Sequence, residues 1–378
     1  MSTHHITHYK KSSKSAKLPE GFLLSAVHCG IKKKRLDLGL ICCQEPASAI
    51  GFFTTNANPS YSVMFSKKNI HNPIKAVLVN SGNANCFTHS QGLKHTEEIA
   101  SCLAHALGTK KANILLASTG IIGKKLPKEK IVKNLAGLIK QLDQKIDMFA
   151  SSILTTDTFT KIAFAKVPLQ KKDVHIIGFA KGAGMIHPQM ATMLAFILTD
   201  ARIKPALFKN ITQAAVEESF NSISVDGCMS TNDNVCFLTS GKISLNNHQT
   251  NAFGHAIRNV CLGLAKMIVK DAEGATKFVE IEVRGAKSKE EAKRAALAVA
   301  SSTLLKCSLW GASPNWGRIA AALGQAGIKA KENISIQSTN LKRKEAKIVI
   351  HLKRGKSQWR TYTSDLTPQY IKFNAGYS

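Results

Sequence analysis

The sequence predicts an α/β protein, because short apolar runs alternate with amphipathic segments between residues 23 and 143. Two of the apolar runs, at residues 76–79 and 114–117, have the length of buried strands, and each ends in a small polar turn. Pro127 then begins a segment whose apolar residues share one helical face: Ile131, Leu135, Leu138, Ile139 and Leu142. Strands and helices therefore alternate along this part of the chain, as they do in α/β folds.

The C-terminal part of the sequence predicts a second, smaller α/β unit. Residues 278–283 and 346–352 alternate as strands do, and residues 289–304 are rich in alanine, a strong helix former. Glu290 and Glu291 fall in the first turn of that helix, where the helix dipole stabilises negative charge. We therefore expect three regions, which are a disordered tail at residues 1–17, a main catalytic domain at 18–275 and a smaller domain at 276–378.

Length and composition fit a globular chain without a membrane span. With 378 residues, of which 44% are hydrophobic, the chain can bury a substantial core. Apolar runs such as residues 193–198 fall far short of the roughly 20 residues that cross a bilayer. Residues 1–17 are rich in His, Ser and Lys and contain no apolar segment of a secretory signal. We expect a cytoplasmic protein with no transmembrane helix.

The cysteines and aspartates predict neither a disulfide framework nor a metal site. The nine cysteines are an odd number, and no two have the Cys-x-x-Cys spacing of zinc or redox sites, which favours reduced thiols. Asp226, Asp233 and Asp271 are widely spaced and have no histidine partner. We expect these aspartates to cap turns and backbone N–H groups.

The net charge of +28 raises a second class of function, nucleic-acid binding. The basic clusters at residues 32–35, 124–125, 342–344 and 353–354 are scattered, and aromatic residues make up only 6% of the chain. No helix-turn-helix, RNA-recognition or zinc-finger pattern occurs. We interpret most of this charge as a solvated lysine surface that also attracts anionic metabolites, and keep nucleic-acid binding as a minor alternative.

Residues 181–194 contain the candidate nucleophile. Gly182 and Gly184 permit a close backbone approach, Pro188 prevents a helix from continuing, and an apolar run follows. Thr192 thereby lies where a loop meets a buried element. An ordinary loop entering a strand has the same pattern, so the residues alone do not decide whether Thr192 is catalytic.

Segments along most of the chain resemble the glutamate N-acetyltransferase (ornithine acetyltransferase) family. Residues 178–200 resemble its signature around the nucleophile. Further blocks follow in the family's order: FTTN at 53–56, VNSGNAN at 79–85, STGIIG at 118–123, TTDT at 155–158, SVDG at 224–227 with STND at 230–233, DAEGATK at 271–277 and PNWGR at 314–318. The resemblance implies a layered α/β sandwich, with two layers of mixed sheet between helices as in Ntn-type hydrolases, and a smaller C-terminal α/β domain.

The resemblance also implies a self-cleaving enzyme. The family's precursor is cut between an alanine and its nucleophilic threonine, here Ala191 and Thr192, which would give chains 1–191 and 192–378. The Thr192 hydroxyl attacks the carbonyl of Ala191, and the freed α-amine, with a pKa of roughly 7.7 to 8.0, then serves as the base. Thr119 and Gly120 correspond to the family's oxyanion-hole pair. The two chains are expected to stay associated and to pair into a heterotetramer.

The remaining site residues are assigned to substrate binding by the same resemblance: Thr155, Thr156, Lys181, Thr192, Glu273, Asn374 and Ser378. The Lys181 ammonium suits a substrate carboxylate, and the Glu273 carboxylate suits an amino group. Which of the two neighbouring threonines contacts the substrate stays open. The chain ends at Ser378, one residue before the family's usual pattern.

We hypothesise that Thr192 takes the acetyl group of N2-acetylornithine, releases ornithine and passes the acetyl group to glutamate, as in arginine biosynthesis. This ping-pong cycle needs no metal ion or other cofactor. The sequence leaves open whether acetyl-CoA also serves as an acetyl donor. The nearest alternative is a self-cleaving amidohydrolase or aminopeptidase of similar fold, in which water takes the acyl group.

Overall fold

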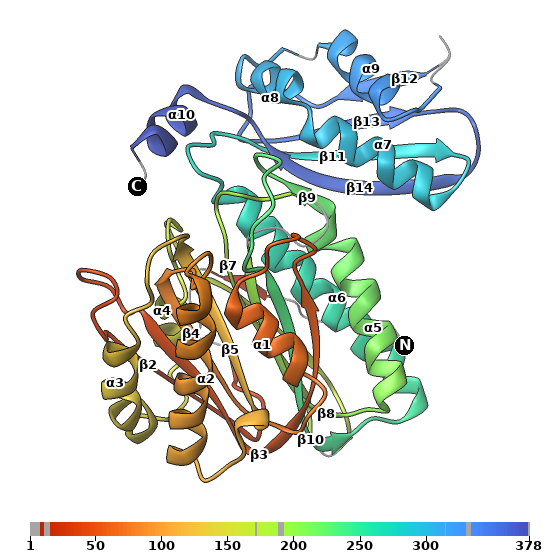
Figure 1. Cartoon of the computed structure of the whole chain (residues 1–378). Helices are drawn as coiled ribbons and strands as arrows, with labels where there is room; N and C mark the ends of the chain where they lie inside the picture. The colour runs from red at the N-terminus through yellow and green to blue at the C-terminus, as the bar shows by residue number, and fades with distance from the viewer. Residues whose placement is uncertain are drawn as a thin grey trace. The chain divides into compact units, whose positions relative to one another are not determined.

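The computed structural model describes residues 8–10, 16–170, 172–187, 193–313, 315–329 and 334–376. The chain divides into two compact units, coloured by position along the chain in Figure 1. The first comprises Met1–Gly182, Thr192–Val216 and Met229–Leu264, and the second Ala183–Ala191, Glu217–Cys228 and Ala265–Ser378. The expected domain boundary between residues 275 and 276 falls inside the second unit.

The first unit contains one extended, mixed sheet system and the helices that cover it. Its strands are β1 (His8–Lys10), β2 (Phe22–Val27), β3 (Leu38–Phe53), β4 (Ile74–Asn83), β5 (Ile114–Ile121), β6 (Lys161–Val167), β7 (Val174–Lys181), β8 (Leu194–Arg202) and β10 (Asn234–Ser244). Its helices are α1 (Tyr61–Asn69), α2 (His89–Ala106), α3 (Lys128–Lys140) and α4 (Ile146–Ser152), with the 3-10 turn η1 (Lys111–Asn113). Helices α5 (Pro205–Glu218) and α6 (Asn247–Lys270) begin in this unit and end in the second.

Strand β3 joins two sheet layers. Its first part pairs antiparallel with β2 and β4, and its last six residues pair antiparallel with β10. The register shifts between Cys42 and Ala47, where the strand passes from one pairing to the other. One layer therefore has the order β2-β3-β4-β5 and the other the order β3-β10-β8-β7-β6-β1. The short strand β1 lies in the segment expected to be a disordered tail.

The core between the two layers is apolar. Val77 and Leu115, from β4 and β5, belong to one buried cluster with Phe179 and Phe196, from β7 and β8. Alternate residues of β4 and β5, such as Leu78 and Leu116, belong to a second cluster with residues of α2 and α3. Figure 1 shows these helices beside β4 and β5. Since side chains alternate across a strand, this pattern requires two buried faces. The predicted layered α/β sandwich is confirmed.

The other outer face of the sandwich is covered by α5 and α6. The ring of Phe208 on α5 packs edge-on against Phe237 of β10, with 6.3 Å between centroids, and Phe253 of α6 lies beside it. Over Gln249–Lys270 helix α6 is long and apolar enough to cross a membrane, yet 61% of its apolar window is buried in protein. Phe253 and Val260 are fully buried. We therefore interpret α6 as a core helix.

Two predicted helices can be compared with the structure. The helix predicted to begin at Pro127 is confirmed as α3, and Ile131, Leu135 and Leu138 are its buried residues. The helix predicted over residues 289–304 is two helices, α7 (Lys289–Ser301) and α8 (Thr303–Trp310). They are separated because Ser302 adopts an extended conformation, and its side chain caps α8 by accepting from the N–H of Leu305.

The second unit is a smaller α/β layer. Its strands are β9 (Ile223–Ser224), β11 (Phe278–Ala286), β12 (Ser335–Ser338), β13 (Glu345–His351) and β14 (Ser357–Ser364), in the order β12-β13-β11-β14-β9. Its remaining elements are α7, α8, α9 (Trp316–Gln325), α10 (Pro368–Ala375) and the 3-10 turn η2 (Phe220–Ser222). Alternate residues of β11, beginning with Val279, pack in one apolar cluster with α7, α8 and α9.

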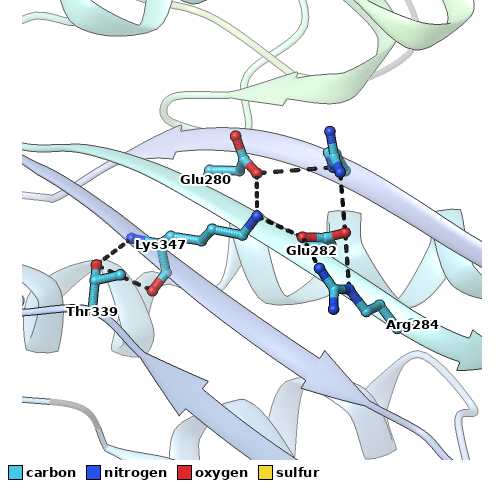
Figure 2. A network of polar contacts seen from close by, with 6 residues as sticks. Glu280, Glu282, Arg284, Thr339 and Lys347 are labelled. Atoms are coloured by element: carbon cyan, nitrogen blue, oxygen red, sulfur yellow. Dashed lines mark hydrogen bonds and ion pairs between the residues drawn. The ribbon is translucent and has the colours of Figure 1, made fainter.

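The opposite face of β11 is charged. The buried Glu282 carboxylate accepts hydrogen bonds from Arg284, at 3.0 and 3.1 Å, and forms an ion pair with Lys347 at 2.6 Å (Figure 2). Arg360 approaches the same carboxylate at 3.3 Å. Burial alone would raise the pKa of Glu282, but these hydrogen bonds and charges lower it to about 2.

Candidate active site

The ends of β4 and β5 form the first part of the candidate site. These strands are parallel neighbours, with Gly82 opposite Gly120. Gly120 has φ of +135°, and a Cβ atom there would lie 2.3 Å from the backbone carbon of Gly82. Only glycine fits this position, because the backbone of β4 approaches Gly120 closely. The Thr119 side chain is 5% exposed and lies within hydrogen-bond reach of Lys181, with 3.3 Å between Oγ1 and Nζ.

Asn232 holds this strand end in place. Its side-chain amide donates to the carbonyl of Ala84 at 2.7 Å and to that of Ser118 at 2.8 Å. Thr54 donates in turn to the carbonyl of Ser230 at 2.7 Å. The STND block at residues 230–233 is therefore fastened to the residues just before Thr119, so its role is to position the predicted oxyanion-hole pair.

Asp157 organises the segment that carries Lys181. Its carboxylate accepts hydrogen bonds from Lys161 Nζ at 2.6 Å, from the N–H of Gly182 at 2.7 Å and from the N–H of Thr155 at 3.0 Å. Burial alone would raise the pKa of Asp157, but the charges of Lys161 and Lys181 and the hydrogen bonds hold it well below its usual range. One buried carboxylate thus ties a predicted substrate threonine to the residue after Lys181.

The exposure of the two candidate threonines does not show which of them contacts the substrate. Thr155 and Thr156 are both half-buried. Lys181, at the end of β7, is 3% exposed and so lies inside the protein rather than on its surface. Buried lysines are rare unless they interact with other groups. Within the first unit, Asp157 therefore holds Thr155 and the residue after Lys181, and Lys181 in turn donates to Thr119.

Ala191 and Thr192, the predicted cleavage pair, lie outside the described residues. The next residue, Met193, is described and is 1% exposed, and its N–H donates to Asp233 Oδ1 at 2.8 Å. Burial raises the pKa of Asp233 well above its ordinary value. Asp233 Oδ2 is buried without a hydrogen-bond partner in the described part of the chain. The predicted N–H capping role of Asp233 is confirmed, and its carboxyl group fixes the start of β8, at the residue that follows Thr192 in the sequence.

Glu273 and Asn374 meet in the second unit. The Asn374 side chain donates to Glu273 Oε2 at 3.1 Å, and the Glu273 N–H donates to the carbonyl of Ala183 at 3.0 Å. A Cβ atom on Gly184 would lie 2.3 Å from Glu273 Oε2, so this carboxylate packs directly against the glycine-rich loop. Two predicted substrate-binding residues that are far apart in sequence are therefore neighbours. The third C-terminal candidate, Ser378, lies outside the described residues.

Asp226 fastens the same loop of the second unit. It accepts hydrogen bonds from the N–H groups of Met185 at 2.5 Å and Ile186 at 2.9 Å, and from Cys228 at 3.1 Å. Its predicted role in capping backbone N–H groups is confirmed. Tyr370 donates to the same carboxylate at 3.3 Å. The loop is thus held by the Asp226 carboxylate and by the backbone N–H of Glu273.

Two residues of the site were missed by sequence reasoning. Asp157 lies inside the TTDT block, two residues after Thr155, but its link to Gly182 depends on a contact across 25 positions. Lys32 was grouped with a scattered basic cluster, although its ammonium donates to the carbonyl of Leu154 at 2.9 Å. The position of Asp157 within a motif block was a usable signal, whereas the sequence carried none for Lys32.

Comparison with known proteins gives concordant matches. The model of a family described as the ArgJ family matches residues 23–378. The arginine biosynthesis bifunctional protein ArgJ of Geobacter sulfurreducens is 40% identical, covering 95% of this chain and 99% of that protein. The protein of the same name from Thermotoga neapolitana is 38% identical, and the match again covers 95% of this chain and 99% of that protein. The solved ornithine acetyltransferase of Mycobacterium tuberculosis, complexed with ornithine, is 30% identical over 48% of this chain and 98% of that chain, with a TM-score of 0.44.

Proposed function

The chain belongs to the ArgJ family, and from that premise we propose that it transfers the acetyl group of N2-acetylornithine to glutamate in arginine biosynthesis. The products are ornithine and N-acetylglutamate. The observation that supports this assignment beyond family membership lies within the first unit. The buried Asp157 carboxylate accepts hydrogen bonds from the N–H groups of Thr155 and Gly182, and Lys181, the residue before Gly182, donates to Thr119.

The reaction is a ping-pong acyl transfer through Thr192. The Thr192 hydroxyl adds to the acetyl carbonyl, its proton passes to the free α-amine of the same residue, and the C–N bond to ornithine breaks as that nitrogen takes up a proton. Glutamate's amino group then attacks the acetyl ester and regenerates the hydroxyl. Support comes from Met193, whose N–H is held by Asp233 at 2.8 Å one residue beyond the nucleophile.

Thr119 and Gly120 stabilise the oxyanion of each tetrahedral intermediate. The Lys181 ammonium donates to Thr119 Oγ1, which leaves the hydroxyl proton of Thr119 to donate to the oxyanion. The backbone N–H of Gly120 supplies the second donor. Removing one donor of this kind costs roughly 2.7 to 4 kcal/mol of transition-state stabilisation.

Two residues of opposite charge are proposed to bind the substrate. The Lys181 ammonium pairs with a substrate carboxylate. Glu273, to which Asn374 donates a hydrogen bond, offers a carboxylate to an amino group of the substrate. Ser378, Thr155 and Thr156 complete the proposed contacts. The cycle consumes no cofactor, and acetyl-CoA remains a second acetyl donor to be assayed.

The active enzyme requires a cut between Ala191 and Thr192, because only a free α-amine can act as the base. Chains 1–191 and 192–378 stay associated and pair into a heterotetramer in the cytoplasm. The substrates are small molecules, and this proposal gives no role to nucleic acid or to a membrane.

A denaturing gel with N-terminal sequencing, run beside an acetyl-transfer assay, tests the proposed function. Wild-type protein should give two bands, the smaller beginning at Thr192, and should release ornithine in proportion to added glutamate. The Thr192→Ala variant should remain one inactive chain. Release of ornithine and free acetate without any dependence on glutamate would instead identify a hydrolase.

A further inference from the structure

The loop that carries Lys32, between β2 and β3, is held by a fully buried carboxylate. Asp37 is 0% exposed and accepts hydrogen bonds from the N–H groups of Cys29 at 2.6 Å, Gly30 at 3.1 Å and Lys32 at 2.9 Å. Three backbone donors on one carboxylate fix the loop conformation and so the direction in which the Lys32 side chain leaves it. The following residues 33–35 are exposed. Lys32 therefore differs from the other lysines of its basic cluster.

The Lys32 side chain runs along the end of β4 toward the candidate site. A Cβ atom on Gly82 would lie 3.0 Å from Lys32 Cγ, and Gly82 pairs with Gly120 of the oxyanion-hole pair. At its other end the ammonium donates to the carbonyl of Leu154 at 2.9 Å, one residue before Thr155. These contacts place Lys32 between the predicted oxyanion donors and the predicted substrate threonines.

Electrostatics agree with this placement. Burial lowers the pKa of the Lys32 ammonium to about 8; the charges of Arg35 and Lys181 lower it further, and those of Asp37 and Asp157 raise it. The charge on Lys32 thus interacts with that of Lys181 and with that of Asp157, the carboxylate that positions Lys181. Lys32 is half-buried, so part of the residue is accessible to solvent. At pH 7 most Lys32 side chains carry a positive charge.

An ammonium group has three N–H donors, and in the described part of the chain Lys32 gives one of them to Leu154. The two substrates differ in charge. Each brings one α-carboxylate, but glutamate adds a second carboxylate on its side chain, whereas N2-acetylornithine carries an ammonium there. A second lysine near Lys181 attracts the side-chain carboxylate of glutamate and repels the side-chain ammonium of N2-acetylornithine.

We propose that Lys32 is a specificity-determining residue that binds the side-chain carboxylate of the glutamate acceptor, while Lys181 binds its α-carboxylate. This inference rests on the proposed function, because it assumes that glutamate is the acceptor. It concerns the second half of the cycle only. Loading of the acetyl group from N2-acetylornithine does not require Lys32.

The test uses Lys32→Met, which keeps most of the length of the side chain but removes its charge. Lys32→Arg is the conservative variant, and the exposed neighbour Lys33→Met is the matched control. For Lys32→Met, the KM for glutamate should rise at least about tenfold, as loss of a charged hydrogen bond predicts. The KM for N2-acetylornithine should stay the same or fall, because the repulsion of its side-chain ammonium is removed, and the burst of ornithine released without glutamate should change less than about twofold. Lys32→Arg should recover most of the affinity, and Lys33→Met should match wild type.

Glutamine as acceptor supplies a readout that a purely structural lysine would not affect. Wild type should use glutamate far better than glutamine, and Lys32→Met should lose most of that preference by losing activity with glutamate alone. An equal loss with both acceptors, an unchanged KM for glutamate or a smaller ornithine burst would overturn the inference. Wild-type enzyme that transfers no acetyl group to glutamate would contradict the proposed function itself.

Discussion

Two buried carboxylates, Asp157 in the first unit and Glu282 in the second, are surrounded by cations and yet have different tasks. Both have a lowered pKa although burial alone would raise it. Asp157 receives two backbone N–H groups from segments that end at the candidate site. Glu282 lies within a strand, and its carboxylate is held by the side chains of Arg284 and Lys347 (Figure 2). The Arg360 side chain donates to the same carboxylate.

The difference shows that a buried carboxylate with a shifted pKa marks a functional site only when it orients groups that reach the substrate. Asp157 connects Thr155 with the residue after Lys181, so its loss should misplace both. Glu282 neutralises positive charge on one face of a sheet, so its loss should lower the stability of the folded protein without changing its activity. Changes at the two positions therefore separate positioning from stability.

Asp157→Asn should have the largest effect. It leaves the Lys161 ammonium buried without its ion pair, which costs about 3–5 kcal/mol of folding free energy, and displacement of Lys181 should lower kcat/KM about a hundredfold. Urea unfolding and steady-state kinetics measure the two losses. The double variant Asp157→Asn/Lys161→Met should regain stability but not activity; recovery of both would reduce Asp157 to a structural role.

Gly120→Ala should rank second. The added Cβ would meet the backbone of Gly82 at 2.3 Å and would disfavour the left-handed φ, so the oxyanion donors should shift and kcat should fall about a hundredfold or more. Gly108→Ala is the matched control, because Gly108 also has positive φ but a Cβ atom there would meet nothing within 4 Å among the described residues. Assays of both variants should show loss only for the first. Equal activity would remove Gly120 from the oxyanion hole.

Thr119→Val tests the hydroxyl itself at nearly constant shape. It should lower kcat by about a hundred- to a thousandfold with little change in the KM for either substrate, because the lost donor acts mainly in the transition state. Thr119→Ser, which keeps a hydroxyl group, should retain most of the activity. If the valine variant kept its kcat, Thr119 would have no catalytic role.

Glu282→Gln should have the smallest effect and should leave acetyl transfer unchanged. Because the folded-state pKa of Glu282 lies at about 2, below its ordinary value of 4.5, the unfolded chain binds more protons between these values. The stabilisation is therefore present above pH 4.5 and is lost as the pH falls toward 2. Partly exposed partners screen it, so we expect about 1 kcal/mol. Unfolding free energies from pH 6 to pH 2 should fall less steeply for Glu282→Gln than for wild type.

Local periodicity was enough to predict some elements of the sandwich, namely two of its strands and one of its helices. The apolar runs at 76–79 and 114–117 lie within β4 and β5, and the helical face containing Leu135 is buried in α3. Ser302, which divides the predicted helix at 289–304, was harder to foresee because serine is tolerated inside helices as well as at their caps.

The candidate site was predicted by resemblance, and its support depends on contacts that no local pattern contains. Asn374 meets Glu273 across 101 positions, and Lys32 meets Leu154 across 122. Such pairs depend on how the strands are connected, so single-sequence reasoning cannot place them. The roles of the site residues, and Thr192 above all, stay predictions.

The most direct test of acetyl transfer through Thr192 is the mass of the protein after it is mixed with N2-acetylornithine and quenched in acid without glutamate. The account predicts two chains, of which the one beginning at Thr192 is heavier by one acetyl group located on that residue, and predicts that added glutamate removes it. A single uncut, unmodified chain that turns over at the full rate would contradict it.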